Sequence, residues 1–164
     1  MVILGIDPGL ATVGYGIILA ERGGYKPLDY GVILTPKDAR FPERLQMIER
    51  GISTLIDKYK PNEIALEELF FNNNQKTAIN VAQARGVIVN TCFHYTDKLF
   101  EYTPLQIKQA LTGYGRADKR QIQSMVTSFL SLKKIPRPDD AADALAVALT
   151  HANTARFSSS FGIK

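Results

Sequence analysis

Four carboxylate side chains lie at three widely separated points of this 164-residue sequence, each beside an apolar stretch. Asp7 follows the strand-like run VILGI, Glu67 follows EIAL, and the pair Asp140 and Asp143 opens a helical run. Carboxylate oxygens are the ligands that Mg²⁺ prefers, and Mg²⁺ held by clustered carboxylates commonly serves phosphate chemistry. These residues therefore predict a metal-dependent enzyme that acts on phosphoesters.

Asp7 occupies a position that favours a role in a site. It ends an apolar strand and precedes Pro8-Gly9, so its carboxylate is expected at the carboxyl end of a sheet, where ligands bind in open α/β folds. The alternative is a turn residue that serves only Pro8-Gly9. Because an acid that finishes a buried strand seldom serves packing, we interpret Asp7 as a metal ligand.

The second acid is ambiguous by strand alternation. Ala65 and Glu67 share one face of the expected strand, whereas Leu66 and Glu68 share the other. Periodicity alone does not decide which of the two glutamates faces the site.

Asp140 and Asp143 are three residues apart, which places both carboxylates on one helix face within about one turn. The alternative is that acids at a helix start serve capping and the macrodipole. Asp139, which follows Pro138, satisfies that alternative and can cap the helix itself. Asp143 lies among alanines in the part expected to be buried, and a buried carboxylate needs a partner.

Positive charge is concentrated in one part of the chain. The net charge is +4, but the stretch from residue 98 to residue 137 holds eight basic residues against the two acids Glu101 and Asp118. The basic residues are Lys98, Lys108, Arg116, Lys119, Arg120, Lys133, Lys134 and Arg137. Such a patch attracts polyanions through counterion release, although an ordinary solvated face is the alternative.

Composition and length limit the remaining choices. An apolar fraction of 45% in 164 residues suffices for one core, so we expect a single domain over residues 1–155 and a loosely ordered tail over residues 156–164. The single cysteine, Cys92, cannot form an internal disulfide and is expected to be a small buried hydrophobe. The sequence has no apolar run of about 20 residues and no leader-like start, which predicts a cytoplasmic protein with no membrane segment.

The elements that must position these residues follow from apolar periodicity. Three strands in the first 35 residues are expected to form an antiparallel meander, with a turn near Gly23-Gly24. A helix from Pro42 to a point before Pro61, a strand over 63–68, a helix over 76–94 and a strand over 98–103 follow. Three helices complete the chain, from Pro104 to about Leu111, from about Asp118, and over 140–152. The fold class is therefore α/β, a mixed sheet with helices on its faces.

Several motifs together resemble one known family. They are GIDPG with GYG downstream, ALEELF, QARG, QIKQALTGYGRADKRQIQ and DDAADALAVALTHA, spread from Val2 to His151. This combination resembles the RuvC family of Holliday junction resolvases. The resemblance implies a ribonuclease-H-like, mixed five-stranded sheet flanked by helices. It also implies that Asp7, Glu67, Asp140 and Asp143 are the catalytic and metal-binding acids, which selects Glu67 over Glu68.

The resemblance further implies an activity and partners. A member of this family is expected to be a homodimer that nicks two opposed strands of a four-way DNA junction during recombination and repair, together with RuvA and RuvB. Two Mg²⁺ ions, for which Mn²⁺ can substitute, would activate water and leave 5′-phosphate and 3′-hydroxyl ends.

Residues expected to contact DNA follow from the same resemblance. Lys108 and Lys119 match lysines around the active site of the family, and Arg116 and Arg120 would add backbone contacts. Phe70 matches an aromatic residue that stacks on bases near the junction centre. The alternatives are exposed helix lysines and a core phenylalanine. His94 and His151 are expected to be structural or surface residues, although some relatives use a histidine near the last helix acids, where this chain has Asp.

Part of the sequence also resembles another class of protein. GIDPG also resembles the first phosphate loop of actin-like and sugar-kinase ATPases, but those enzymes need a second domain and a second glycine-rich loop. A ribonuclease that cuts RNA:DNA hybrids and a non-catalytic junction-binding module remain as alternatives. Assays of metal-dependent cutting of junctions, duplexes and hybrids would distinguish a junction resolvase from these two alternatives.

Overall fold

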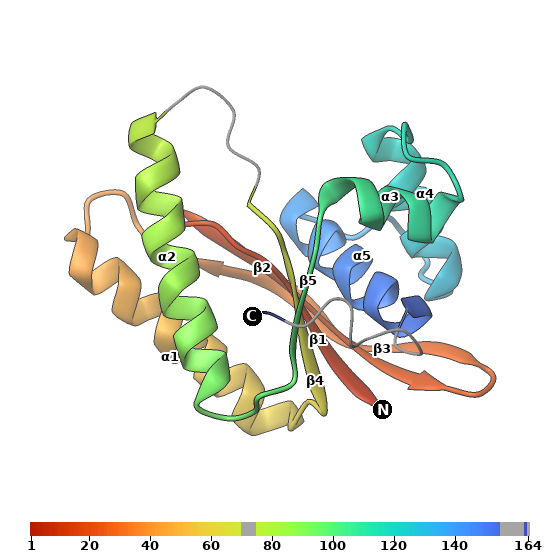
Figure 1. Cartoon of the computed structure of the whole chain (residues 1–164), viewed down its shortest axis with the longest axis horizontal. Coiled ribbons are helices and arrows are strands. Elements are labelled where there is room, and N and C mark those ends of the chain that lie inside the picture. The colour runs from red at the N-terminus through yellow and green to blue at the C-terminus, as the bar shows by residue number, and fades with distance from the viewer. Residues whose placement is uncertain (70–74, 155–162, 164) are drawn as a thin grey trace.

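A five-stranded mixed sheet forms the centre of the protein in a computed structural model that describes residues 1–69, 75–154 and 163 (Figure 1). The strands are β1 (Val2–Asp7), β2 (Thr12–Glu21), β3 (Gly24–Leu34), β4 (Glu63–Glu67) and β5 (Leu99–Tyr102), in the spatial order β3-β2-β1-β4-β5. β1, β2 and β3 pair antiparallel, whereas β4 pairs parallel with both β1 and β5. The predicted meander and mixed sheet are confirmed.

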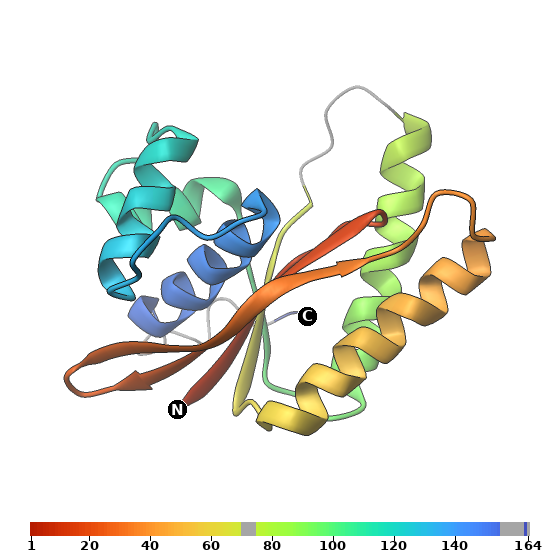
Figure 2. The ribbon, with the colours of Figure 1, turned by 180° about the vertical axis from the view of Figure 1, so that it is seen from behind.

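Helices cover both faces of this sheet. They are α1 (Phe41–Tyr59), α2 (Gln75–Phe93), α3 (Pro104–Thr112), α4 (Lys119–Phe129) and α5 (Asp139–Thr154). Figures 1 and 2 show α1 and α2 on one face and α5 on the other, with α3 and α4 packed over α5. Each face has its own apolar core, one built around Ile6, Ile48 and Ile88 and the other around Ile3, Ala65 and Leu145. None of the helices in the described part of the chain is long and apolar enough to cross a membrane.

Local sequence signals explain where the helices begin. α1 starts with a proline in its first turn and ends where Lys60 adopts a left-handed conformation, directly before Pro61. Thr103 and Asp118 cap α3 and α4, and in each case the residue three positions later completes a capping box. The Asp118 cap fixes Lys119 as the first residue of α4.

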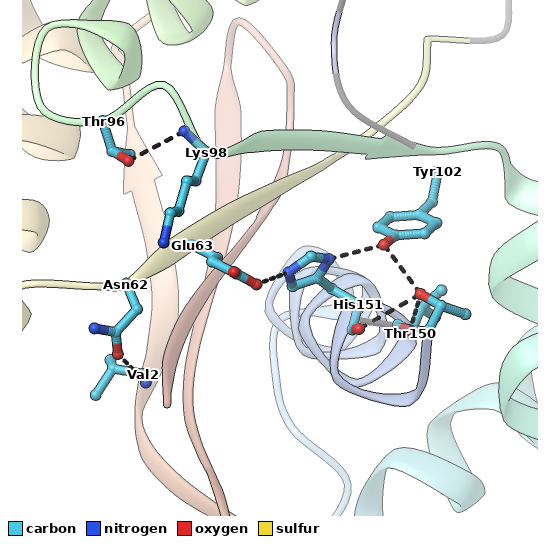
Figure 3. A network of polar contacts seen from close by, with 9 residues as sticks. Val2, Asn62, Glu63, Thr96, Lys98, Tyr102, Thr150 and His151 are labelled. Carbon is cyan, nitrogen blue, oxygen red and sulfur yellow. Dashed lines mark hydrogen bonds and ion pairs between the residues drawn. The ribbon is translucent and has the colours of Figure 1, made fainter. Parts of the chain in front are cut away.

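A buried polar network ties the far end of α5 to the sheet (Figure 3). The His151 ring is fully buried, with Nε2 2.6 Å from Glu63 Oε2 and Nδ1 2.7 Å from the Tyr102 hydroxyl. Burial lowers the pKa of His151, although Glu63 opposes this. Glu63 opens β4 and Glu67 closes it, so this network lies at the opposite end of the strand from the predicted site. His151 is thus structural, as predicted.

Three further sequence predictions are located by the fold. Cys92 is buried, and burial raises the pKa of its thiol to about 12, which confirms its role as a small hydrophobe. His94 is exposed and its Nδ1 lies 2.8 Å from the Asn90 carbonyl. The tail predicted over 156–164 lies outside the described residues except at Ile163, whose N–H donates to the Leu99 carbonyl at 3.0 Å.

Candidate active site at the carboxyl end of the sheet

Glycines on the inner strands allow α5 to lie directly on the sheet. A Cβ atom at Gly14 would be 2.1 Å from the Asp140 carbonyl oxygen, and one at Gly5 would be 2.2 Å from the Ala144 carbonyl oxygen. Side chains of any size at these positions would separate the helix from the strands. The close approach sets the height of the first turns of α5, and hence of Asp140 and Asp143, above β1 and β2.

Asp7 and Glu67 are brought together by the register of β1 and β4. Ile6 of β1 pairs with Leu66 of β4. The next residues, Asp7 and Glu67, are the last of their strands, so they lie side by side. Glu67 has the same strand parity as Ala65, which packs in the α5 core, whereas Glu68 lies beyond the strand and is exposed. The structure therefore places Glu67, and not Glu68, on the face that α5 covers.

Asp143 faces the same place from α5. It lines a cavity of about 200 Å³ together with Glu67 and the basic residues Lys108 and Lys119. Apolar side chains from α3, α4 and α5 complete the wall, namely Pro104, Ile107, Ile122 and Ala146. The cavity thus has two acids and two amines in an otherwise apolar lining.

The four predicted acids are electrostatically coupled. Burial raises the pKa of Asp7 to about 8, and repulsion by Glu67, Asp143 and Asp140 adds to this shift. Burial also raises the pKa of Glu67 to about 7, with a further contribution from Asp143. The pKa of Asp143 is raised by burial as well, although its hydrogen bond from Lys119 opposes the change. Clustered, half-buried carboxylates of this kind gain stability when a cation neutralises them.

Lys119 provides positive charge within this group. Its Nζ lies 3.1 Å from Asp143 Oδ2 and 3.3 Å from Asp139 Oδ2. Burial lowers the pKa of Lys119, but the two carboxylates outweigh burial and raise it. Lys119 was predicted to contact phosphate, and the structure places its amine directly beside a predicted metal ligand.

The other basic residues are distributed differently. Lys108 lines the carboxylate cavity, as expected of a residue near the active site. Arg116 is exposed in the α3–α4 connection, and Arg120 lines a separate cavity with Tyr114 and Gln121. The structure does not bring either arginine to the acids. Phe70 lies outside the described residues.

The interpretation of Asp139 as a helix cap is wrong. Asp139 is the first residue of α5, and the Ala141 N–H donates to the Pro138 carbonyl instead. The Asp139 carboxylate accepts a hydrogen bond from Gln123 Nε2 at 3.1 Å and pairs with Lys119 and Arg137. Partners from α4 thus use the carboxylate that the sequence assigned to the helix terminus. In the sequence, the basic residue Arg137 two positions earlier is the signal that could have indicated an ion pair for Asp139.

Metal-binding capacity follows from the donor set. All four predicted ligands are carboxylates, which suit a hard divalent cation. Within residues 1–69, 75–154 and 163, no three His, Cys, Asp or Glu side chains are grouped tightly enough to hold an ion as they stand. The ion pair between Lys119 and Asp143 explains part of this, because it turns one carboxylate toward an amine. The residue types fit a hard cation, and a cation at Asp143 would take the place of this amine.

The raised pKa of Asp7 predicts how stability depends on pH when no metal is bound. Between its ordinary value of 3.8 and about 8, native Asp7 holds a proton that the unfolded chain has lost. The free energy of unfolding therefore falls as pH rises through this window. Urea unfolding in EDTA from pH 5 to pH 8 should show this loss for wild type. Asp7→Asn should show a flatter profile and be more stable at pH 8, by about 1–3 kcal/mol. Parallel profiles would contradict the electrostatic argument.

The family model, the curated relatives and the solved structures that match this chain all point to the same family. The family model "Crossover junction endodeoxyribonuclease RuvC" matches residues 3–151. RuvC of Clostridioides difficile is 57% identical over 154 residues, which cover 94% of this chain and 91% of that protein. RuvC of Alkaliphilus oremlandii is 56% identical over 164 residues, covering 100% of both. The solved structure of T. thermophilus RuvC in complex with a Holliday junction substrate matches with a TM-score of 0.90 and 33% identity, covering 99% of this chain and 100% of that one.

The sheet order and the match to this solved structure define a protein of the ribonuclease-H-like fold. That fold also serves other chemistries, so the family model and the full-length identities make the finer assignment. The chain belongs to the RuvC family of crossover junction endodeoxyribonucleases, which are phosphodiester hydrolases. Membership in this family implies metal-dependent catalysis.

Proposed function

We propose that this chain resolves Holliday junctions by paired nicking of two opposed DNA strands, leaving 5′-phosphate and 3′-hydroxyl ends. The observation that carries the proposal is the placement of Asp7, Glu67 and Asp143 around one end of the sheet, in a chain that belongs to the RuvC family. The cuts would serve DNA recombination and repair.

Four residues would hold the metal, namely Asp7, Glu67, Asp140 and Asp143. Two Mg²⁺ ions bound there, or Mn²⁺ in their place, would supply an activated water and neutralise charge on the leaving 3′ oxygen. The apolar wall of the cavity limits water around the acids, which strengthens their interaction with a cation. Protons on Asp7 and Glu67 would be released as the metal binds, because ligation requires the ionised form.

The basic residues would hold the substrate. Lys108 and Lys119 line the cavity beside the acids, at a suitable place to bind the phosphate that is cut. Arg116 and Arg120 extend the positive surface along the α3–α4 connection and the start of α4, where the backbone of a junction arm would pass. From the family resemblance, Phe70 is proposed to stack on a base near the junction centre.

Two opposed cuts need two active sites, so the working unit would be a homodimer. Exposed apolar side chains on the outer helix α2, Ile79 and Phe93, support an interface there because they leave 60% and 64% of their surface uncovered. RuvA and RuvB are proposed as partners from the family resemblance. The cytoplasm is the proposed location, since the proposed substrate is a DNA junction and the single cysteine is a buried free thiol.

Cleavage of defined DNA substrates tests this proposal. Purified protein with Mg²⁺ should nick a four-way junction symmetrically in two opposed strands, and EDTA should stop it. A linear duplex and an RNA:DNA hybrid of the same sequence should be cut at least tenfold more slowly. Preferred cutting of the hybrid would favour a ribonuclease instead. Junction binding without any nick in Mg²⁺ or Mn²⁺ would favour a non-catalytic binding module.

A further inference from the structure

Lys119 forms ion pairs with two acids of α5, Asp139 and Asp143, to which the family resemblance assigns different roles. Asp143 is one of the four predicted metal ligands, whereas Asp139 is not. The two carboxylates hold the same ammonium group at 3.1 and 3.3 Å. Lys119 itself is half exposed, so without fixed partners its long side chain would sample many rotamers in water. The pairing therefore determines where this positive charge is found.

Asp139 is held in place by a hydrogen bond from Gln123 and an ion pair with Arg137. The Gln123 side chain, which is only 4% exposed, donates its amide to Asp139 Oδ1 at 3.1 Å. Arg137 pairs with the same oxygen. The second oxygen, Oδ2, is left to face Lys119. A buried amide needs a hydrogen-bond partner, so Gln123 gives the carboxylate a fixed orientation.

The two contacts to Asp139 from α4 have a common origin. Lys119 and Gln123 are four residues apart, which places them on one face of the helix, one turn from each other. This face is turned toward the first turn of α5. Asp139 thus joins the start of α4 to the start of α5 at the edge of the carboxylate cavity.

We propose that Asp139 is a positioning residue for strand cleavage, which keeps the Lys119 ammonium group at the carboxylate cavity when Asp143 turns to a metal ion. This inference rests on the proposed function, because it assumes that Asp143 ligates a metal during cleavage. A cation bound at Asp143 Oδ2 would displace Lys119 from that oxygen, because two positive charges repel there. Asp139 remains as the second partner, so the amine stays beside Glu67 and Lys108, where the phosphate would bind.

A double-mutant cycle on junction cleavage tests this role. Single-turnover cleavage at saturating Mg²⁺ is compared for wild type, Asp139→Asn, Lys119→Ala and the double variant. Asp139→Asn should slow cleavage roughly 2–5-fold, the size expected for the loss of one partly exposed, oriented ion pair. Lys119→Ala should slow it more, and adding Asp139→Asn to Lys119→Ala should change nothing further. Junction affinity of Asp139→Asn should stay within about twofold of wild type, because this variant keeps the Lys119 amine.

A second readout follows the amine directly, without activity. Acetylation of Lys119 by an N-hydroxysuccinimide ester, followed by peptide mass spectrometry of metal-free protein, should be faster in Asp139→Asn than in wild type. Asp57→Asn is the matched control, because Asp57 pairs with exposed Lys60 at 3.4 Å on α1, in the other helical layer. It should change neither the cleavage rate nor the acetylation of Lys119.

The possible failures are distinguishable. Wild type that never cuts junctions in Mg²⁺ would overturn the proposed function itself. Active wild type with an equally active Asp139→Asn would overturn only the positioning role. An Asp139→Asn effect that persists at full size in the Lys119→Ala background would also overturn it, because Asp139 would then act on the metal or on the fold.

Discussion

Replacing Asp7 with asparagine is expected to abolish strand cleavage, with a loss of roughly 10³–10⁴-fold or more in single-turnover rate. Asparagine keeps the shape of the side chain but cannot carry a negative charge. Asp7 is the acid whose pKa is affected by all three of the others, Glu67, Asp140 and Asp143. Junction affinity should remain within about twofold, because phosphate contacts by basic side chains dominate binding. Gel-shift assays in Ca²⁺ and cleavage assays in Mg²⁺ measure the two quantities separately.

A neighbouring acid provides the control for this variant. Glu68 follows Glu67 directly, but it is exposed beyond the end of β4 and has the opposite strand parity. Glu68→Gln removes the same charge from the same region and should cut junctions at close to the wild-type rate. Residual activity of Asp7→Asn near that of Glu68→Gln would show that Asp7 does not hold the metal.

Loss of activity and gain of stability should accompany each other at Asp7. Burial and three acidic neighbours make the ionised form costly in the metal-free protein, which is why the pKa of Asp7 is raised to about 8. The same arrangement favours a bound cation, because the cation removes the repulsion. The close approach of the four acids thus destabilises the metal-free protein and at the same time favours metal binding.

Much of this geometry could be predicted from single residues. Asp7 closes an apolar strand before Pro8-Gly9, and that pattern alone locates it at the carboxyl end of the sheet. Asp143 was expected to be buried and to need a partner; its side chain is partly buried, at 27% exposed, and Lys119 is the partner. These predictions succeeded because strand parity and helix periodicity determine direction locally. The choice between Glu67 and Glu68 needed the family resemblance, since it depends on which face of β4 packs against α5.

The features that were missed depend on how distant elements meet. Asp139 was interpreted as a cap because a helix start suffices to explain an acid, but α4 approaches from the side with Lys119 and Gln123. No local pattern specifies that crossing. Arg116 and Arg120 are not in the lining of the carboxylate cavity, and their predicted contacts with the DNA backbone stay a prediction.

Enlarging Gly14 to alanine should separate the acids of α5 from those of the strands. Gly14 pairs with Asp7 across β1 and β2, and an added Cβ would lie 2.1 Å from the Asp140 carbonyl oxygen and 2.6 Å from its carbon. Those atoms are helix backbone and cannot rotate away, so the first turn of α5 must shift. A shift of about 1 Å at catalytic groups can cost roughly 100-fold in rate. Overpacking should also lower the free energy of unfolding by about 1–3 kcal/mol.

Gly23→Ala is the matched control, because it adds the same methyl group in the exposed turn between β2 and β3, where no atom lies within 4 Å of the added Cβ. Gly23 is not in the left-handed backbone conformation, so Gly23→Ala should leave the free energy of unfolding within about 0.5 kcal/mol of wild type and leave cleavage unchanged. Urea unfolding and single-turnover cleavage of both variants separate packing from chemistry. If Gly14→Ala stays folded and cuts at the wild-type rate, close packing of α5 does not position Asp140 and Asp143. If it stays folded at the assay temperature but cuts about 100-fold more slowly, the height of α5 above the sheet is a determinant of the active site as direct as the carboxylates themselves.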